Sequence, residues 1–396
     1  LISVDEALER ILKSVRPLGS ERVALAEAAR RVLAEDVRAK LFNPAFDVSA
    51  MDGYAVRAED VQPGVTLRMI GASQAGAGFD GTVGPGQCAR IFTGAPVPSG
   101  ADAVIMQEET RAEGDAITFE CDVAAGRSIR FRGEDFSQGD VLVAAGAALD
   151  PRKIALAAAG NVADVAVSVR PRVALLATGD ELVAPGGVVG PDQIVASNSV
   201  GLGAFFTGHG AQVRDLGIVA DDRDVLGDAL GRALAEKPDI LLTTGGASVG
   251  EHDFVQDMLK ANGVDIDFWR IAMRPGKPLM LGRTGKTVVF GLPGNPVSAL
   301  VTARIFVLPA VLKMMGGTLP AALYLPLAED LPPNGPRRHF MRGRLVSDAE
   351  RGTQVEPIRQ TDSGHLSSLA SADVLIVQDE NCSGKARGEI IAAHLL

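Results

Sequence analysis

The sequence is poor in the residues that build metal–thiolate, disulfide and base-stacking sites. Its three cysteines, Cys88, Cys121 and Cys382, lie far apart and form neither a CxxC pair nor a zinc-type spacing. Aromatic residues make up 4% of the chain, which argues against binding of single-stranded nucleic acid by base stacking. Lysine and arginine total 39 against 49 aspartates and glutamates, and so acidic a chain is a poor candidate for broad nucleic-acid binding.

Long hydrophobic runs are also scarce. The best candidate for a membrane span, residues 297–315, is interrupted by Arg304, so we expect no stretch of the ~18–20 apolar residues needed to cross a bilayer. The N-terminus does not show the charged-then-apolar pattern of a secretory signal. Together with the few, scattered cysteines, these features favour a cytoplasmic protein that does not bind membranes.

What the sequence does contain begins with helix signals. Ser3 can cap a helix over residues 3–15, because a glutamate stands three residues later and apolar residues follow at helical spacing. The alanine-rich residues 23–37 predict a second helix, and Asp150-Pro151 opens a third that reaches about residue 159. Residues 57–150 carry short apolar runs separated by frequent glycines, which predicts a small β-rich domain.

From about residue 172 to residue 317, buried strands alternate with helices. This alternation predicts a parallel sheet covered by helices on both faces, and residues 320–396 return to short strands and turns. The predicted strands are 173–177, 212–219, 240–242 and 288–290, and the predicted helices are 199–208, 224–236, 254–261 and about 296–315.

Three of these strands end in glycine-rich turns, at residues 178–181, 243–253 and 291–298. In open parallel sheets, ligands bind at the carboxyl ends of the strands. Glycines expose backbone N–H groups there, and phosphate or another oxyanion is the natural guest. Ordinary strand-to-helix turns are the alternative, and three such turns in one sheet disfavour it. The P-loop and dinucleotide-binding fingerprints are missing from the sequence.

Charged side chains cluster near the same strand ends. Arg270, Arg274 and Lys277 lie within eight residues that two prolines stiffen, which suits a phosphate or a tetrahedral oxyanion. A solvated basic loop is the alternative. Carboxylates beside a phosphate site suggest Mg²⁺. These carboxylates are Asp180, Glu181, Asp221, Asp222 and Asp253. Asp180 and Glu181 could instead interact favourably with the dipole of a helix N-terminus.

Taken in order, these segments resemble the MoeA family of molybdopterin molybdenumtransferases, and they are also similar to the E domain of gephyrin. The resemblance covers nearly the whole chain, beginning with residues 44–56 and their Ser-Ala-Met-Asp-Gly-Tyr-Ala core. It continues through residues 93–95, 133–135, 178–182, 197–199, 221–222, 244–253, 274–278 and 291–299.

The resemblance implies a step of molybdenum cofactor assembly. The substrates would be molybdate and adenylylated molybdopterin, Mg²⁺ would assist, AMP would be released, and molybdenum would remain on the dithiolene sulfurs of the pterin. Because those sulfurs belong to the substrate, the protein would need no metal-binding cysteines. Two alternatives stay open: a molybdopterin adenylyltransferase, whose α/β domain alone would look much the same, and a non-catalytic scaffold like gephyrin.

The resemblance also assigns roles to residues that are far apart in sequence. Catalytic roles fall on Asp52, Thr93, Asp135, Glu181 and Asp253. The Mg²⁺ ligands would be Glu181, Asp221 and Asp253, although the adjacent Asp222 could take the place of Asp221. Contacts to the substrate or its anionic groups fall on Ser248, Arg270, Arg274, Lys277, Asn295, Ser298, Arg342 and Ser363.

The resemblance implies a homodimer in which the active site lies between the α/β domain of one subunit and a domain of its partner. Asp52, Thr93 and Asp135 would then act in trans. Molybdopterin adenylyltransferase and apo-molybdoenzymes would be partners. The predicted domains are a helical and mixed linker (1–45 with 134–171), an inserted β-rich domain (46–133), a central α/β/α parallel-sheet domain like molybdopterin adenylyltransferase (172–318) and a small C-terminal β-barrel-like domain (319–396).

Overall fold

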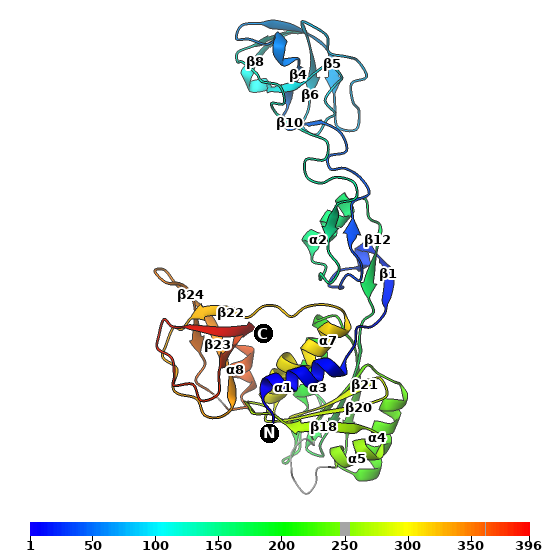
Figure 1. Ribbon diagram of the computed structural model, residues 1–396, viewed down its shortest axis with the longest axis vertical. Coiled ribbons are helices and arrows are strands. Elements are labelled where there is room, and N and C mark those ends of the chain that lie inside the picture. The colour runs from blue at the N-terminus through cyan, green and yellow to red at the C-terminus, as the bar shows by residue number, and fades with distance from the viewer. Residues whose placement is uncertain (246–253, 361) are drawn as a thin grey trace.

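The computed structural model describes residues 1–245, 254–360 and 362–396. The chain forms an elongated molecule (Figure 1). A β-rich distal body stands at one end, a small middle body follows, and the α/β part lies at the other end with the C-terminal β part beside it. Two segments of the chain link the distal body to the middle body, because residues 46–133 are inserted between the two halves of the middle body.

The first helix, α1 (Val4–Ser14), begins as its sequence predicts. The Ser3 side chain accepts a hydrogen bond from the backbone N–H of Glu6 at 3.1 Å and so caps the helix. The helix buries Val4, Ala7 and Ile11 in the core of the α/β part.

Residues 23–37 contain no α-helix, only the short 3-10 turn η1 (Leu25–Glu27), so the prediction of a helix there is wrong. Strand β1 (Ser20–Ala24) pairs antiparallel with β12 (Asp164–Ser168) instead, and Arg30 adopts a left-handed backbone conformation (φ 63). Alanine favours a helix only weakly, and this long-range pairing overrides it. The rest of the middle body comprises β2 (Val37–Arg38), β11 (Val141–Val143) and α2 (Pro151–Ala159), the helix that Asp150 caps as predicted.

The distal body is built around a six-stranded sheet, which confirms the β-rich prediction. Strand β4 (Gly53–Val56) lies so close to the edge strand β7 (Ala103–Met106) that a Cβ on Gly53 would fall 1.8 Å from the carbonyl oxygen of Ile105. In spatial order the strands are β7 (Ala103–Met106), β4 (Gly53–Val56), β6 (Gln87–Ile91), β5 (Thr66–Ser73), β9 (Ala116–Phe119) and β8 (Thr110–Glu113). Around them lie η2 (Ala58–Asp60), η3 (Gln107–Glu109) and the pair β3 (Val48–Ser49) and β10 (Ile129–Arg130) at the base.

The α/β part is a six-stranded sheet between two helical layers. Its first four strands are parallel, as predicted, and its last two are antiparallel strands that the sequence reading missed. In spatial order they are β16 (Gln212–Val219), β13 (Arg172–Thr178), β17 (Ile240–Thr244), β21 (Thr287–Leu292), β20 (Pro278–Thr284) and β18 (Asp265–Arg270). One face carries α4 (Arg223–Ala235) and α5 (Val255–Ala261), and the other carries α1, α3 (Ser197–Gly208) and the long helix after β21.

That long helix runs from Pro296 to Met314 in three segments: α6 (Pro296–Thr302), η4 (Ala303–Val307), a wider π turn, and α7 (Leu308–Met314). Its length and composition are sufficient for a membrane span, so the expectation that no stretch reaches this length is wrong. Of its most apolar window, 83% is buried inside the structure, as in a core helix. Arg304 does not interrupt the helix, because its guanidinium donates to the carbonyl of Leu395 at 2.9 Å.

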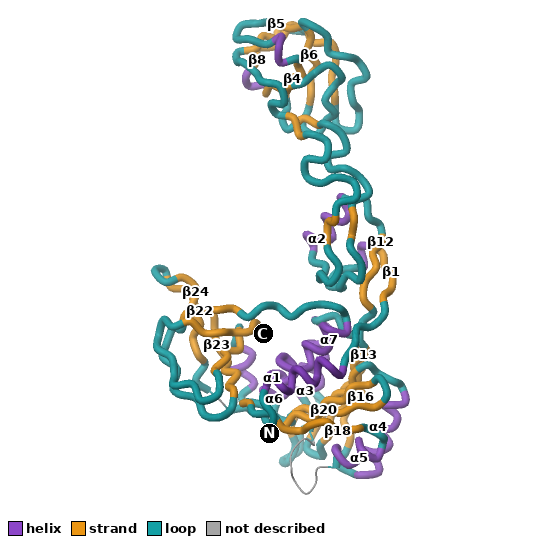
Figure 2. The backbone as a smooth tube through the Cα atoms, in the orientation of Figure 1, coloured by secondary structure: helices purple, strands orange, loops and turns teal. Residues whose placement is uncertain are grey.

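The C-terminal part is a sheet that nearly closes into a barrel (Figure 2). A bridge between Leu327 and Val355 joins the first strand of this part to β24 and completes the ring. A short strand from the α/β part, β19 (Met273–Arg274), pairs in parallel with β23, so the two parts share backbone hydrogen bonds. The other elements are β22 (Leu323–Pro326), β23 (Arg338–Asp348), β24 (Gly352–Pro357), α8 (Leu366–Ala370), β25 (Val374–Gln378) and β26 (Ile390–Leu395).

Candidate active site

Three strand ends meet at the carboxyl edge of the α/β sheet, as the glycine-rich turns predict. Strands β13, β17 and β21 end at Thr178, Thr244 and Leu292. Gly245 has a φ of +90°, and a Cβ at this position would lie only 2.3 Å from the carbonyl oxygen of Thr178. The turns after β13 and β17 can therefore approach this closely only because residue 245 has no side chain.

A cavity of about 590 Å³ lies at these strand ends. Both the α/β part and the C-terminal part contribute to its wall. Six residues that the sequence reading singled out line it: Glu181, Arg274, Lys277, Asn295, Ser298 and Ser363. Several other polar residues line the cavity, although the sequence predicted no role for them: Thr178, Ser197, Asn198, Ser199, Thr244 and Arg337.

Three cations line the cavity and form what we call its cationic wall: Arg274 and Lys277 in the turn between β18 and β20, and Arg337 in the C-terminal part. The peptide bond before Pro275 is cis, and Gly276 has a φ of +97°. A Cβ on Gly276 would lie 2.4 Å from the Cγ2 atom of Thr302, so the turn packs tightly against helix α6. The chain therefore fixes the backbone that carries Arg274 and Lys277, rather than leaving a solvated basic loop.

Three cations of this wall carry no carboxylate counterion within the described ranges. The guanidinium of Arg274 donates to the Oδ1 atom of Asn334 at 2.8 Å, and its Nε atom is buried without a partner. Burial lowers the pKa of Arg274, and the nearby charge of Arg337 lowers it further. Lys277 and Arg337 make no ion pair in the described part of the chain. A dianion bound here would meet positive charge that no protein group neutralises.

Neutral side chains that also line the cavity are already oriented. The side-chain amide of Asn295 donates to Ser363 Oγ at 2.8 Å, which connects helix α6 to the C-terminal part. The side-chain amide of Asn198 donates to the carbonyl of Gly294 at 2.7 Å, which leaves its buried Oδ1 without a partner. A ligand with a hydrogen-bond donor could satisfy that oxygen.

Two predicted anion contacts take other positions. Arg342 is 4% exposed, and its guanidinium donates to the carbonyls of Asp362 and Gln360 and to Ser368 Oγ. It therefore supports the loop that carries Ser363 and does not face the cavity. Arg270 does not line the cavity either, because its guanidinium lies 4.8 Å from the ring centroid of Trp269. Arg337 lines the cavity but was not predicted to do so. The two adjacent arginines, Arg337 and Arg338, after Pro336 are the sequence feature that could have indicated it.

Two carboxylates at neighbouring strand ends fit a hard cation. Glu181 follows β13 and folds back over Gly179, and Asp221 follows the adjacent strand β16, where its N–H donates to Asp180 Oδ1 at 3.1 Å. Asp222 is different, because its carboxylate caps α4 by accepting from two backbone N–H groups at 3.0 Å. Capping of α4 therefore already occupies the carboxylate of Asp222. Short strands β14 (Leu182–Val183) and β15 (Ile194–Val195) lie beyond Glu181.

The described residues alone do not complete a metal site. Within the ranges that the structure describes, no group of three His, Cys, Asp or Glu side chains could hold a metal ion. Asp253, the third predicted ligand, and Ser248 lie outside the described residues. Carboxylate oxygens are nevertheless the ligands that Mg²⁺ prefers, and one or two protein carboxylates suffice when a phosphate supplies the rest. The carboxylates of Glu181 and Asp221 therefore have the ligand chemistry that the ion prefers.

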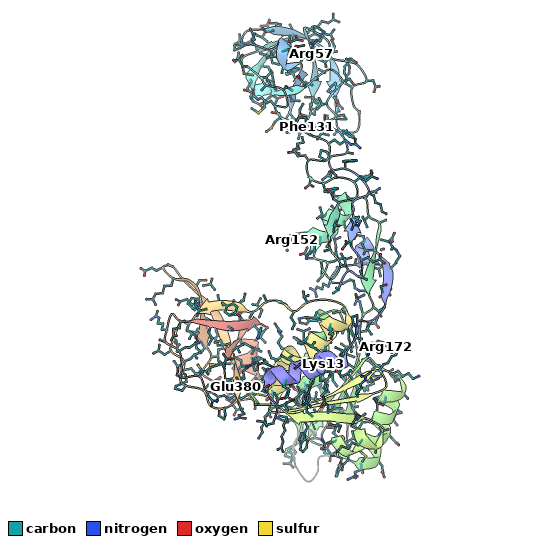
Figure 3. The ribbon with its side chains drawn as sticks, in the orientation of Figure 1. Lys13, Arg57, Phe131, Arg152, Arg172 and Glu380 are labelled. Carbon is teal, nitrogen blue, oxygen red and sulfur yellow. The ribbon has the colours of Figure 1, made fainter. Side chains whose placement is uncertain are left out.

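The remaining predicted residues lie in other bodies of the subunit. Asp52 Oδ1 accepts hydrogen bonds from the backbone N–H and the hydroxyl of Thr93 at 2.7 and 2.8 Å, and these bonds lower its pKa. Asp135 accepts from the side-chain amide of Asn43 at 2.8 Å, and Phe131, four residues earlier in the chain, lies at the base of the distal body (Figure 3). None of these side chains lines the cavity of its own subunit.

Models of known protein families match almost the whole chain. Residues 2–160 match the MoeA N-terminal region (domain I and II), and residues 174–313 match a probable molybdopterin binding domain. Residues 324–396 match the MoeA C-terminal region (domain IV).

Full-length relatives agree with this division. A molybdopterin molybdenumtransferase from Haemophilus influenzae is 35% identical over 100% of both chains. One from a Nostoc species is 39% identical over 90% of this chain and 84% of its own length. The crystal structure of a molybdopterin biosynthesis MoeA protein from Pyrococcus horikoshii matches 100% of both chains with a TM-score of 0.85 and 31% identity. The chain thus belongs to the MoeA family of molybdopterin molybdenumtransferases, the transferases of molybdenum cofactor biosynthesis.

Proposed function

We propose that the cavity at the strand ends binds molybdate together with adenylylated molybdopterin. In this proposal, transfer of molybdenum to the dithiolene sulfurs accompanies release of AMP. The observation that carries the proposal is the cationic wall formed by Arg274, Lys277 and Arg337, which has no carboxylate counterion within the described ranges. Molybdate and AMP phosphate are both oxyanions, and this wall offers charge and hydrogen-bond donors to either.

The wall would bind an oxyanion strongly because little has to change on binding. The turn that carries Arg274 and Lys277 is held by its glycine and prolines, so few backbone states are lost when a ligand arrives. Arg274 is partly desolvated already, which strengthens its attraction to an anion. The neutral groups Asn295 and Ser363 complete the wall without adding negative charge.

Glu181 and Asp221 would hold Mg²⁺, with Asp253 as the third predicted ligand. When bound, the ion would neutralise charge on the phosphate oxygens of the adenylate and so favour the departure of AMP. Glu181 lines the cavity after β13, and Asp221 follows the adjacent strand β16, so in this proposal an ion held at these two strand ends would meet the adenylate phosphate. The protein's own residues then bind the two substrates next to each other and hold them in position.

The subunit acts as a homodimer in this proposal. Asp52 and Thr93 are exposed and hydrogen-bonded to each other, yet they lie on a distal body that is separate from the cavity of the same chain. A second copy could bring this pair and Asp135 to the cavity of its partner. The protein would work in the cytoplasm, receive its adenylylated substrate from molybdopterin adenylyltransferase, and deliver product to apo-molybdoenzymes.

Release of AMP tests the proposal. The protein is incubated with adenylylated molybdopterin, molybdate and Mg²⁺, and AMP is followed over time. We expect AMP to appear only with all components present, and Glu181→Gln to need more Mg²⁺ for the same rate. AMP release by Glu181→Gln and Asp253→Asn with the wild-type dependence on Mg²⁺ would refute the metal assignment. ATP-dependent adenylylation of molybdopterin in place of AMP release would favour the adenylyltransferase alternative.

A further inference from the structure

Asn334 is a buried side chain on the segment that enters strand β23, and it is 7% exposed. Its side-chain amide nitrogen donates to the backbone carbonyls of Arg337 and Asp379, both at 2.8 Å. Its backbone N–H donates to the carbonyl of Cys382 at 2.9 Å. These bonds fix the position and the orientation of the side chain, with the carbonyl oxygen directed away from its own β domain.

That oxygen reaches the cavity wall. Asn334 Oδ1 accepts a hydrogen bond from Arg274 Nη2 at 2.8 Å, across the boundary between the two parts of the chain. The backbone supports the contact, because Arg274 in β19 is in register with His339 in β23. Among the described residues this is the one hydrogen bond that the Arg274 guanidinium makes, so Asn334 supplies the hydrogen bond that orients it there.

The side-chain amide of Asn334 contacts two residues of like charge, Arg274 and Arg337. Arg274 and Arg337 both line the cavity, and the positive charge of Arg337 disfavours the charged form of its neighbour. Their repulsion would push the guanidinium of Arg274 away from the cavity if nothing held it. Asn334 binds the side chain of one cation with its oxygen and the backbone of the other with its nitrogen.

We propose that Asn334 is a positioning residue that holds Arg274 against Arg337 so that both cations face one bound dianion. This inference rests on the proposed function, since it takes molybdate as the dianion. A neutral amide suits the task, because it orients the guanidinium and leaves its charge available to the ligand. A carboxylate at the same place would form an ion pair with Arg274 and remove that charge from the site.

A double-mutant cycle tests whether Asn334 acts through Arg274. Sodium molybdate is titrated calorimetrically into the full-length protein and into Arg274→Ala, Asn334→Ala and the double variant. We expect Asn334→Ala to weaken molybdate binding roughly tenfold, the factor that ~1.4 kcal/mol represents. In the Arg274→Ala background the same substitution should have no further effect. Equal weakening in both backgrounds would overturn the proposal.

The controls separate this inference from its foundations. Asn262→Ala removes an amide that also donates to two carbonyls, but it lies beside α4 and α5, so it should lower stability without changing affinity. Asn334→Asp should bind molybdate more weakly than Asn334→Ala, because it neutralises Arg274, and wild-type affinity would refute the charge argument. If Asn334→Ala does not fold, Asn334→Ser can replace it in the same cycle, because serine retains a donor and an acceptor. We expect Asn334→Ser to lose less molybdate affinity than Asn334→Ala would, and an unchanged affinity would refute the proposal. If Arg274→Ala itself binds molybdate normally, the proposed function fails instead.

Discussion

Replacing Gly245 with alanine tests whether the strand ends need their close approach. The added Cβ would lie 2.3 Å from the carbonyl oxygen of Thr178, whereas real Cβ contacts are essentially never below 3.0 Å. The turns must therefore separate by about 0.7 Å. The backbone also has a φ of +90°, which costs a residue with a side chain about 1–3 kcal/mol. Both effects act at the wall of the proposed molybdate site.

Gly217→Ala is the matched control. Gly217 has a φ of +86° in strand β16 of the same sheet, but nothing lies within 4 Å of its added Cβ. The unfolding free energy of both variants should fall by about 1–3 kcal/mol because of the backbone conformation. Only Gly245→Ala should lose further stability and also bind molybdate more weakly. Urea unfolding can be followed by the single tryptophan, Trp269, which lies in β18 of the same sheet. If the two variants match in stability and affinity, the close-approach argument fails.

Three further predictions concern other parts of the molecule. Burial and the charge of Arg274 lower the pKa of His339 to about 4, so the imidazole stays neutral in the fold but protonates in the unfolded chain. The folded protein is therefore most stable above about pH 6.5, and its unfolding free energy should fall by on the order of 3 kcal/mol between pH 6.5 and about 4, below which it should level off. Urea titrations of His339→Gln should lack this slope. Arg342→Leu should lower the unfolding free energy by about 1–3 kcal/mol for each carbonyl left without a donor, and an unchanged melting temperature would contradict its supporting role. The variants Asp52→Asn and Lys277→Ala should each be inactive on their own. When the two are mixed, dissociated and reassembled, half of the random dimers would carry one intact shared site out of two, so the mixture should regain roughly a quarter of the wild-type rate. No recovery would contradict a site shared between subunits.

Local signals were sufficient for much of the α/β part. Continuous apolar runs such as residues 173–177 are typical of strands buried on both faces, and β13 occupies that stretch. The capping side chains Ser3 and Asp150 marked helix starts correctly. These features depend on neighbours within a few residues, so they can be read from the chain itself.

Long-range pairing could not be read in the same way. Residues 23–37 look helical by composition, but β1 pairs with β12 more than a hundred residues later. Apolar and polar residues alternate less clearly along β18 and β20 than along a typical strand. The antiparallel pairing of these two strands places the cationic turn at the cavity. The roles of Arg342 and Asn334 depend on which groups tertiary packing brings within hydrogen-bond distance, and no local pattern specifies those contacts.

The position of bound molybdate tests the central claim most directly. Crystals of the full-length protein soaked with molybdate and Mg²⁺ would locate molybdenum by its anomalous scattering. We predict a peak in the cavity at the strand ends, within hydrogen-bond distance of Arg274 and Lys277. A peak beside Asp52 and Thr93 of the same subunit, remote from any copy's cationic wall, or no peak in the cavity at saturating molybdate, would contradict the account.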